Sequence, residues 1–149
     1  MSAGSQDHYH FSLEEESGDE FKRYLQGILN AHDEAFPAMQ APKAKRFIVR
    51  VADENGDVVG GAIIWTYWGW LEIELLALEK QVRGRGLGRQ LMKLIEDKAR
   101  EEGCTRTRTE AFDYQALGFY RKLGYRVVGQ LEDYPEGYTY YWMRKDLVK

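Results

Sequence analysis

The chain has 149 residues, of which 44% are hydrophobic, and this length is enough for one well-buried domain but too short for two of usual size. Its formal net charge of -3 argues against nucleic acid as a main partner. A single cysteine excludes an intrachain disulfide, and no apolar run could span a membrane or serve as a signal-peptide core, so no membrane contact and a cytoplasmic location are expected.

The N-terminal part of the chain predicts one strand and one helix. Residues 1–7 are expected to be a flexible polar tail, and the alternation over residues 8–14 predicts a first strand. Apolar residues at helical spacing predict a helix over residues 19–30. Residues 31–45 contain two prolines and are expected to form a loop or a short second helix over a substrate site.

The middle of the chain predicts an antiparallel meander followed by a helix. Strands are expected over residues 46–51, 58–68 and 70–78, with Asn55-Gly56 as a strong hairpin signal and Gly69 in the second turn. A helix with one apolar face is expected over residues 87–102, and Gly103 would stop it.

The last third predicts a strand over residues 105–111, a short helix over 114–123, and a strand pair over 125–130 and 138–145. A strand, helix and strand connected at this length call for right-handed parallel pairing of residues 105–111 with the strand before the helix. The fold class expected is α/β (α+β), with a mixed central sheet of about seven strands flanked by helices, and residues 8–149 would form one domain.

A glycine-rich loop joins the third meander strand to the helix over 87–102. Gly84, Gly86 and Gly88 alternate there with other residues. Alternate glycines let backbone N–H groups converge on an anion, and the helix points its positive dipole end at the same place. No P-loop pattern exists, and a dinucleotide fingerprint would need its third glycine at position 89. The loop therefore predicts a phosphate site, against the alternative of an ordinary glycine-rich turn before a helix.

Two segments of the chain are similar to one known family. The run Gln-x-x-Gly-x-Gly over residues 81–86, followed by Leu-Gly, resembles the acyl-CoA loop of the GNAT superfamily of N-acyltransferases. Residues 116–125 resemble the family's C-terminal segment, and the order of elements resembles the GNAT fold over nearly the whole chain. The resemblance implies an enzyme that transfers an acetyl group from acetyl-CoA to an amine of a small molecule or peptide by direct attack.

The resemblance also implies where acyl-CoA binds. The backbone of Leu76, Ala77 and Leu78 would pair with the pantetheine arm like an extra strand. The pyrophosphate would bind to the loop and helix start, whose residues are Arg83, Gly84, Arg85, Gly86, Leu87, Gly88 and Arg89. Arg83 and Arg89 are the expected side-chain ligands, and the ordinary role for at least one of these arginines is a solvated charge. No metal is expected.

A catalytic base is expected on the strand before the loop. A primary amine is protonated at pH 7, so a group must accept its proton before attack. The resemblance puts Glu72 on the general-base position, acting directly or through water, with Glu74 in reserve. Both would share a face with Leu76 and Leu78 unless a bulge intervenes.

The remaining catalytic groups follow from the same resemblance. A backbone N–H near Ala77 or Leu78 would stabilise the oxyanion. Tyr120 falls on the general-acid position, since a phenol is protonated at pH 7 and can donate to the leaving thiolate. Its ordinary role would be that of a core tyrosine with a satisfied hydroxyl. Asp113 and Tyr114 stand where the family often has a cofactor-binding asparagine.

The acceptor pocket is the least defined part of the site. Aromatic residues gather around expected strand ends: Tyr67, Trp68, Trp70, Tyr134, Tyr138, Tyr140, Tyr141 and Trp142. They are able to line an apolar or cation-binding pocket, or simply to pack the sheet. Glu132, Asp133 and Glu136 could attract an amine, although a solvated loop is the simpler interpretation.

Two other classes of function stay open at this point. A non-catalytic acyl-CoA-binding or regulatory module would keep the loop but would not depend on Glu72 or Tyr120. An RNA-binding domain using Arg-Gly residues is disfavoured by the negative charge and by the absence of further Arg-Gly repeats. Family members often dimerise, so a homodimer is compatible with the resemblance.

Overall fold

The computed structural model describes residues 2–6, 8–15, 18–40 and 43–147. The chain divides into two compact units, Met1–Ala41 and Pro42–Lys149. The first unit contains strands β1 (Ser2–Gln6) and β2 (Tyr9–Ser12), helix α1 (Glu20–Asp33) and the short 3-10 helix η1 (Pro37–Gln40). None of the helices in the described part of the chain has the length and apolar character needed to cross a membrane.

The N-terminal segment differs from the sequence prediction. Residues 2–6 were expected in a polar tail but form β1, which pairs antiparallel with β2 in a two-stranded sheet. Residues 1 and 7 of that segment lie outside the described residues. A ladder is made by backbone groups, so a polar segment can join one when a partner strand lies beside it.

Helix α1 confirms the expected helix and runs three residues further than residue 30. Its aromatic residues Phe21 and Tyr24 stack with ring centroids 5.7 Å apart, as i and i+3 neighbours on one face do. The following segment holds η1, which is the short helix expected there as one of two alternatives.

The second unit is built on a six-stranded sheet. Strands β3 (Lys45–Ala52), β4 (Val58–Tyr67) and β5 (Trp70–Leu78) form the expected antiparallel meander. Gly56 and Gly69 have φ of 84° and 76° in the two turns, a left-handed conformation that glycine adopts without strain. Helix α2 (Leu87–Glu101) then leads to β6 (Arg106–Phe112), which pairs parallel with β5 as expected.

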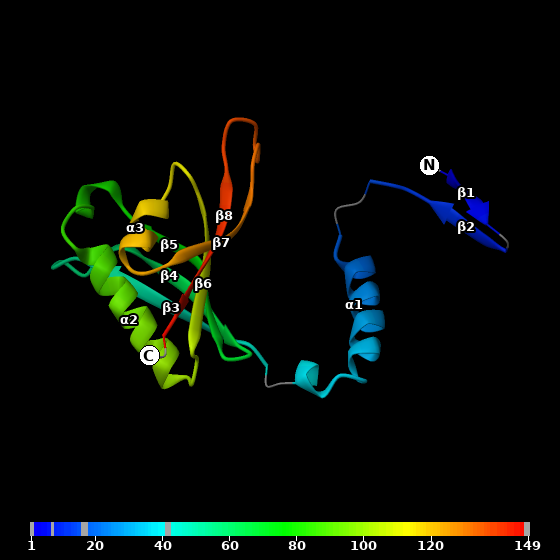
Figure 1. The fold of residues 1–149 in the computed structure, drawn as a ribbon, viewed down its shortest axis with the longest axis horizontal. Helices are drawn as coiled ribbons and strands as arrows, with labels where there is room; N and C mark the ends of the chain where they lie inside the picture. Colours follow the sequence, from blue (N-terminus) through cyan, green and yellow to red (C-terminus); the bar gives the residue numbers. More distant parts are fainter. Residues whose placement is uncertain (1, 7, 16–17, 41–42, 148–149) are drawn as a thin grey trace. The chain divides into compact units, whose positions relative to one another are not determined.

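The C-terminal elements complete the sheet (Figure 1). Helix α3 (Leu117–Lys122) precedes β7 (Arg126–Leu131) and β8 (Tyr140–Asp146), and the strand order is β3-β4-β5-β6-β8-β7. The last strand therefore lies between β6 and β7. It pairs antiparallel with both, so the sheet is mixed, as the sequence predicts.

One face of this sheet and the two helices enclose the core. Alternation along the strands turns Ile64, Leu71 and Thr107 toward the helices, and all three residues are fully buried. The apolar face of α2 covers them. The core cluster contains Ala62, Ile64, Leu71, Ile73, Leu91, Met92, Ile95, Ala99, Cys104, Ala111, Tyr120, Tyr125, Met143 and Leu147.

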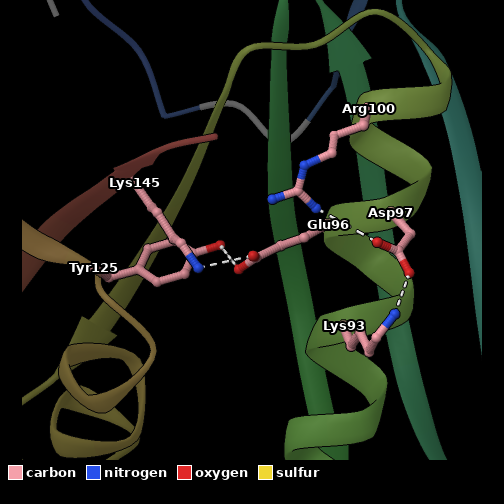
Figure 2. Close-up of polar contacts among 6 residues, drawn as sticks. All are labelled: Lys93, Glu96, Asp97, Arg100, Tyr125 and Lys145. Atoms are coloured by element: carbon pink, nitrogen blue, oxygen red, sulfur yellow. Dashed lines mark hydrogen bonds and ion pairs between the residues drawn. The ribbon is translucent and has the colours of Figure 1, made fainter. Parts of the chain in front are cut away.

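A partly buried ion pair joins α2 to β8 on the face of the sheet that α2 covers. Glu96 on α2 accepts a hydrogen bond from Lys145 Nζ at 2.8 Å and one from the Tyr125 hydroxyl at 3.4 Å. Thr107 donates to the Tyr125 oxygen at 2.6 Å. Figure 2 shows that Lys145 and Tyr125 reach Glu96 from outside the helix, whereas Lys93 pairs with Asp97 along the helix itself. The Lys145–Glu96 pair therefore joins β8 to α2.

Candidate functional site

A bulge in β5 changes which side chains face the core. On β4, Ile64 pairs with Ile73 but Ile63 pairs with Leu75, so Glu74 is an extra residue without a β4 partner. Ile73 faces the core before the bulge, and Leu76 packs against it after the bulge. Glu72 and Leu76 therefore lie on opposite faces of β5. The sequence analysis expected them on one face unless a bulge intervened, and the structure contains that bulge.

The sheet opens between β5 and β6 just beyond Glu72. The described pairing of these strands covers only Trp70, Leu71 and Glu72 with residues 106–108. Further along, β6 continues on β8 alone, up to the pair of Phe112 with Tyr140. The second half of β5 thus has backbone groups on one edge that are free to pair with an extended ligand.

A cleft of about 1060 Å³ occupies this opening. Its walls are the second half of β5, the glycine-rich loop with the first turn of α2, the end of β6, and residues 114–122. This volume suits a large small-molecule ligand. The cofactor residues predicted from the sequence all line it, except Arg85, which is not part of the wall formed by the described residues.

The loop keeps its backbone accessible from the cleft. Gly84 and Gly86 have φ of 76° and 79°, and a Cβ built on either would find no atom within 4 Å. Both positions therefore need glycine for their conformation and leave space for a ligand. A Cβ on Gly88 would lie 3.1 Å from Phe119 Cε1, so this glycine lets α2 and α3 approach closely. The first-turn N–H groups of α2 have no partners within the helix.

Two arginines stand at the loop end of the cleft. Arg83 and Arg89, which the sequence analysis favours as ligands, both line it. Arg83 Nε donates to the Leu78 carbonyl at 2.8 Å, which holds the guanidinium beside the end of β5. The remaining nitrogens of that planar group are available for an anion.

Carboxylates stand at the opposite end. Glu74 and Glu110 line the cleft, whereas Glu72 is not part of the wall formed by the described residues. Arg108 lies between two of them, 3.2 Å from Glu72 Oε1 and 2.8 Å from Glu110 Oε1. Sequence reasoning did not select Glu110. Its signal is the alternation of β6, in which Thr107 and Thr109 are buried and Arg108 and Glu110 share the other face.

Tyr120 combines burial with access to the cleft. Its side chain is 4% exposed, yet it lines the cleft wall opposite β5. Burial raises the pKa of its phenol, with a hydrogen bond to Thr109 acting in the opposite direction. The hydroxyl is therefore fully protonated at neutral pH. The side chain therefore lies both in the core and on the cleft wall.

A cluster of aromatic rings adjoins the cleft at Tyr114. Phe112 contacts the rings of Tyr114, Tyr134 and Tyr140 at centroid distances of 5.5, 6.4 and 4.8 Å. Asp113 exchanges hydrogen bonds with Thr139 and closes the 132–139 loop on β6. Asp133 accepts a hydrogen bond from the Gly137 N–H, so it shapes this loop.

Trp70 and Tyr67, which were also expected near the acceptor, contact arginine side chains of the sheet. The Arg144 guanidinium lies over the Trp70 ring at 4.8 Å, and Arg106 lies over the same ring at 5.6 Å. Tyr67 accepts a hydrogen bond from Arg108 at 3.2 Å. In the ring cluster of Phe112, Tyr114, Tyr134 and Tyr140, Tyr114 lines the cleft and Tyr140 contacts the lining residue Glu110.

Known proteins with similar sequences and structures share one family description. The model of the Acetyltransferase (GNAT) family matches residues 8–125. The chain is 38% identical over 112 residues to a blasticidin-S acetyltransferase of Streptomyces morookaense, which covers 74% of this chain and 82% of that protein.

Solved structures give the same result. An acetyltransferase from Bacillus cereus superposes with a TM-score of 0.80 at 29% identity, over 91% of this chain and 98% of that one. A nourseothricin acetyltransferase superposes with a TM-score of 0.61 at 25% identity, over 72% of this chain and 67% of that one.

Proposed function

The chain belongs to the acetyltransferase (GNAT) family and is an acetyl-CoA-dependent N-acetyltransferase, and from that premise we propose a role for each part of its cleft. The observation that carries the proposal is the continuity of the cleft, which joins the glycine-rich loop to Tyr120. A non-catalytic acyl-CoA-binding module is not favoured. The family match covers residues 8–125, and residues 8–149 as one domain stay a prediction from the sequence.

The donor occupies the half of the cleft between β5 and the loop. The free backbone edge of Leu76, Ala77 and Leu78 pairs with the pantetheine arm. Backbone N–H groups of residues 83–89 and the start of α2 hold the pyrophosphate, with Arg83 and Arg89 neutralising its charge. The open space above Gly84 and Gly86 supports this fit.

The acetyl transfer uses residues from β5 and α3. Glu74 on the cleft wall, or Glu72 through an ordered water, accepts a proton from the amine. The amine nitrogen then bonds to the thioester carbonyl carbon, and a backbone N–H near Ala77 or Leu78 stabilises the oxyanion. As the C–S bond breaks, Tyr120 donates its proton to the sulfur, and the raised pKa of its phenol keeps that proton available. The nitrogen, which carries one surplus proton after its attack, releases it to water, and the Tyr120 phenolate takes a proton back from solvent.

The acceptor is a primary amine on a small molecule. The similarity to a blasticidin-S acetyltransferase and to a nourseothricin acetyltransferase supports this class. The ring cluster that adjoins the cleft at Tyr114 suits a planar or cationic group. A cytoplasmic location and a homodimer stay predictions from the sequence.

Turnover of an amine panel tests this function. The purified protein is incubated with acetyl-CoA and blasticidin S, nourseothricin, an arylalkylamine or a peptide with a free N-terminus, and free thiol is measured. We expect faster thiol release with a small-molecule amine than with the peptide. Thiol release that no amine accelerates would contradict the assignment, and preference for the peptide would contradict the acceptor class.

A further inference from the structure

The carboxylates at the acidic end of the cleft outnumber their cationic partner. Arg108 contacts both Glu72, at 3.2 Å, and Glu110, at 2.8 Å. Its third contact, the Tyr67 hydroxyl at 3.2 Å, is neutral. The neighbouring cation Arg144, opposite Arg108 on β8, is bonded to Asp146 at 2.7 Å, so the contact set of two carboxylates and one guanidinium carries one excess negative charge. A group that brings one positive charge would complete the set.

The two carboxylates differ in their access to the cleft. Glu110 lines the cleft beside Thr109 and Ala111, whereas Glu72 lies at the last paired position of β5, before the strands separate. The uncompensated charge is therefore accessible to a ligand through Glu110. Arg108 contacts both carboxylates, so they share the excess charge, while Glu72 stays inside the paired part of the sheet.

Glu110 is also held in one orientation. Arg108 binds one of its oxygens, and the Tyr140 hydroxyl donates a hydrogen bond to the other. Burial, the hydrogen bond to Glu110 and its charge raise the pKa of Tyr140 to about 12, so this donor keeps its proton at neutral pH. The Tyr140 ring in turn contacts Phe112 at 4.8 Å and Tyr134 at 5.4 Å.

Glu74, the other carboxylate on the cleft wall, lacks such support. It is exposed at the bulge and has no hydrogen bond or ion pair with any residue that the structure describes. A carboxylate fixed by two donors loses less conformational entropy when it binds a ligand than a free one does. Glu110 is therefore better suited to bind a cation. Glu74, whose side chain is not held in place, is better suited to accept and release a proton.

We propose that Glu110 binds the ammonium group of the acceptor and so places its nitrogen at the β5–β6 opening, with Arg108 and Tyr140 as positioning residues. The proposal rests on the proposed function of the cleft. It assigns recognition of the incoming cation to β6 and removal of its proton to β5. The acceptor class that it selects is an amine that is protonated in solution, next to an aromatic or other flat group that fits the ring cluster.

Steady-state kinetics of Glu110→Gln separate this role from the others. Glutamine keeps an oxygen for Tyr140 but removes the charge. We expect the KM for the amine to rise about 10- to 100-fold, the size of a lost charge-assisted hydrogen bond, while the acetyl-CoA affinity measured by titration stays within about two-fold. Glu72→Gln and Glu74→Gln should lower kcat more than they raise this KM, and Glu54→Gln in the β3–β4 turn should change neither.

A second pair of variants tests the role without removing the carboxylate. Glu110→Asp keeps the charge but withdraws it by one methylene, so the KM for the amine should still rise. Tyr140→Phe should raise this KM in the wild-type background and have little effect in the Glu110→Gln background, because the phenol acts through Glu110.

The outcomes distinguish this proposal from the function on which it rests. If no amine is acetylated by the wild-type enzyme, both fail. If the wild type acetylates an amine, and Glu110→Gln and Glu110→Asp keep its KM within about two-fold, only the role of Glu110 is overturned. A loss in kcat alone in both variants would also overturn ammonium binding.

Discussion

Two buried tyrosines with rings 5.4 Å apart have different surroundings, and only one of them lines the cleft. Tyr120 has its phenol at the cleft wall. The Tyr125 hydroxyl forms hydrogen bonds with Thr107 of β6 and Glu96 of α2. Burial raises the pKa of both groups, so acidity alone does not separate them. Position on the cleft is what makes Tyr120 the candidate acid.

Removing each hydroxyl should therefore have a different effect. We expect Tyr120→Phe to lower kcat by about 100-fold or more, the typical contribution of a general acid, with acetyl-CoA affinity unchanged. Tyr125→Phe should lower the free energy of unfolding by about 1 kcal/mol and leave kcat nearly unchanged. Thiol-release kinetics and thermal unfolding measure the two effects. Equal kcat values for the two variants would contradict the role of Tyr120.

Residues of the site were predictable where one short segment determines them. Gly84, Gly86 and Tyr120 belong to local motifs whose neighbours in sequence are also their neighbours in space. The contact of Glu110 with Tyr140 joins residues 30 positions apart and exists only because β8 pairs with β6. No local pattern carries that information, and sequence reasoning therefore missed it.

At the scale of elements, α2 depends on one buried ion pair more than on its surface pairs. The side chains of Lys145 and Glu96 are 25% and 10% exposed, and they join β8 to the helix. Those of Lys93 and Asp97 are 78% and 55% exposed and lie on the same helix. Ion pairs in water contribute little to stability, whereas an unpaired buried carboxylate is costly.

Matched methionine variants compare these pairs. Lys145→Met keeps the apolar stem but leaves Glu96 without its cation, so we expect the free energy of unfolding to fall by about 2 kcal/mol, below the value for a fully buried pair. Lys93→Met should cause no measurable change. Urea unfolding measures both. Equal stability of the two variants would show that the Glu96 contact does not anchor α2.

Element boundaries were predictable within a few residues, but irregularities were not. Leu75 and Leu76 are both apolar, so the alternation of β5 fits the sheet with or without a bulge at Glu74. Helix α3 begins at Leu117 and not at 114, because the Gln115 side chain and backbone both bond to Phe112 and form a turn first. Such choices depend on tertiary packing.

At the scale of the whole molecule, the cleft separates charge along its length. Arg83 and Arg89 stand at the loop end, and Glu74 and Glu110 stand at the end where β5 leaves β6. An anionic donor and a cationic acceptor would therefore approach from different ends. The mixed sheet and the parallel crossover were predictable, because chain order and connection length limit the topology. The position of β8 between β6 and β7 could not be predicted from the sequence.

Calorimetric titration with acetyl-CoA tests the central claim, that the glycine-rich loop holds the donor in this cleft. The wild type is compared with Gly86→Glu, which puts a carboxylate into the loop, and with Gly56→Glu, which strains a β3–β4 turn of similar φ away from the cleft. We predict micromolar binding by the wild type and by Gly56→Glu, and loss of binding by Gly86→Glu. No binding by the wild type, or equal binding by all three proteins, would contradict the account.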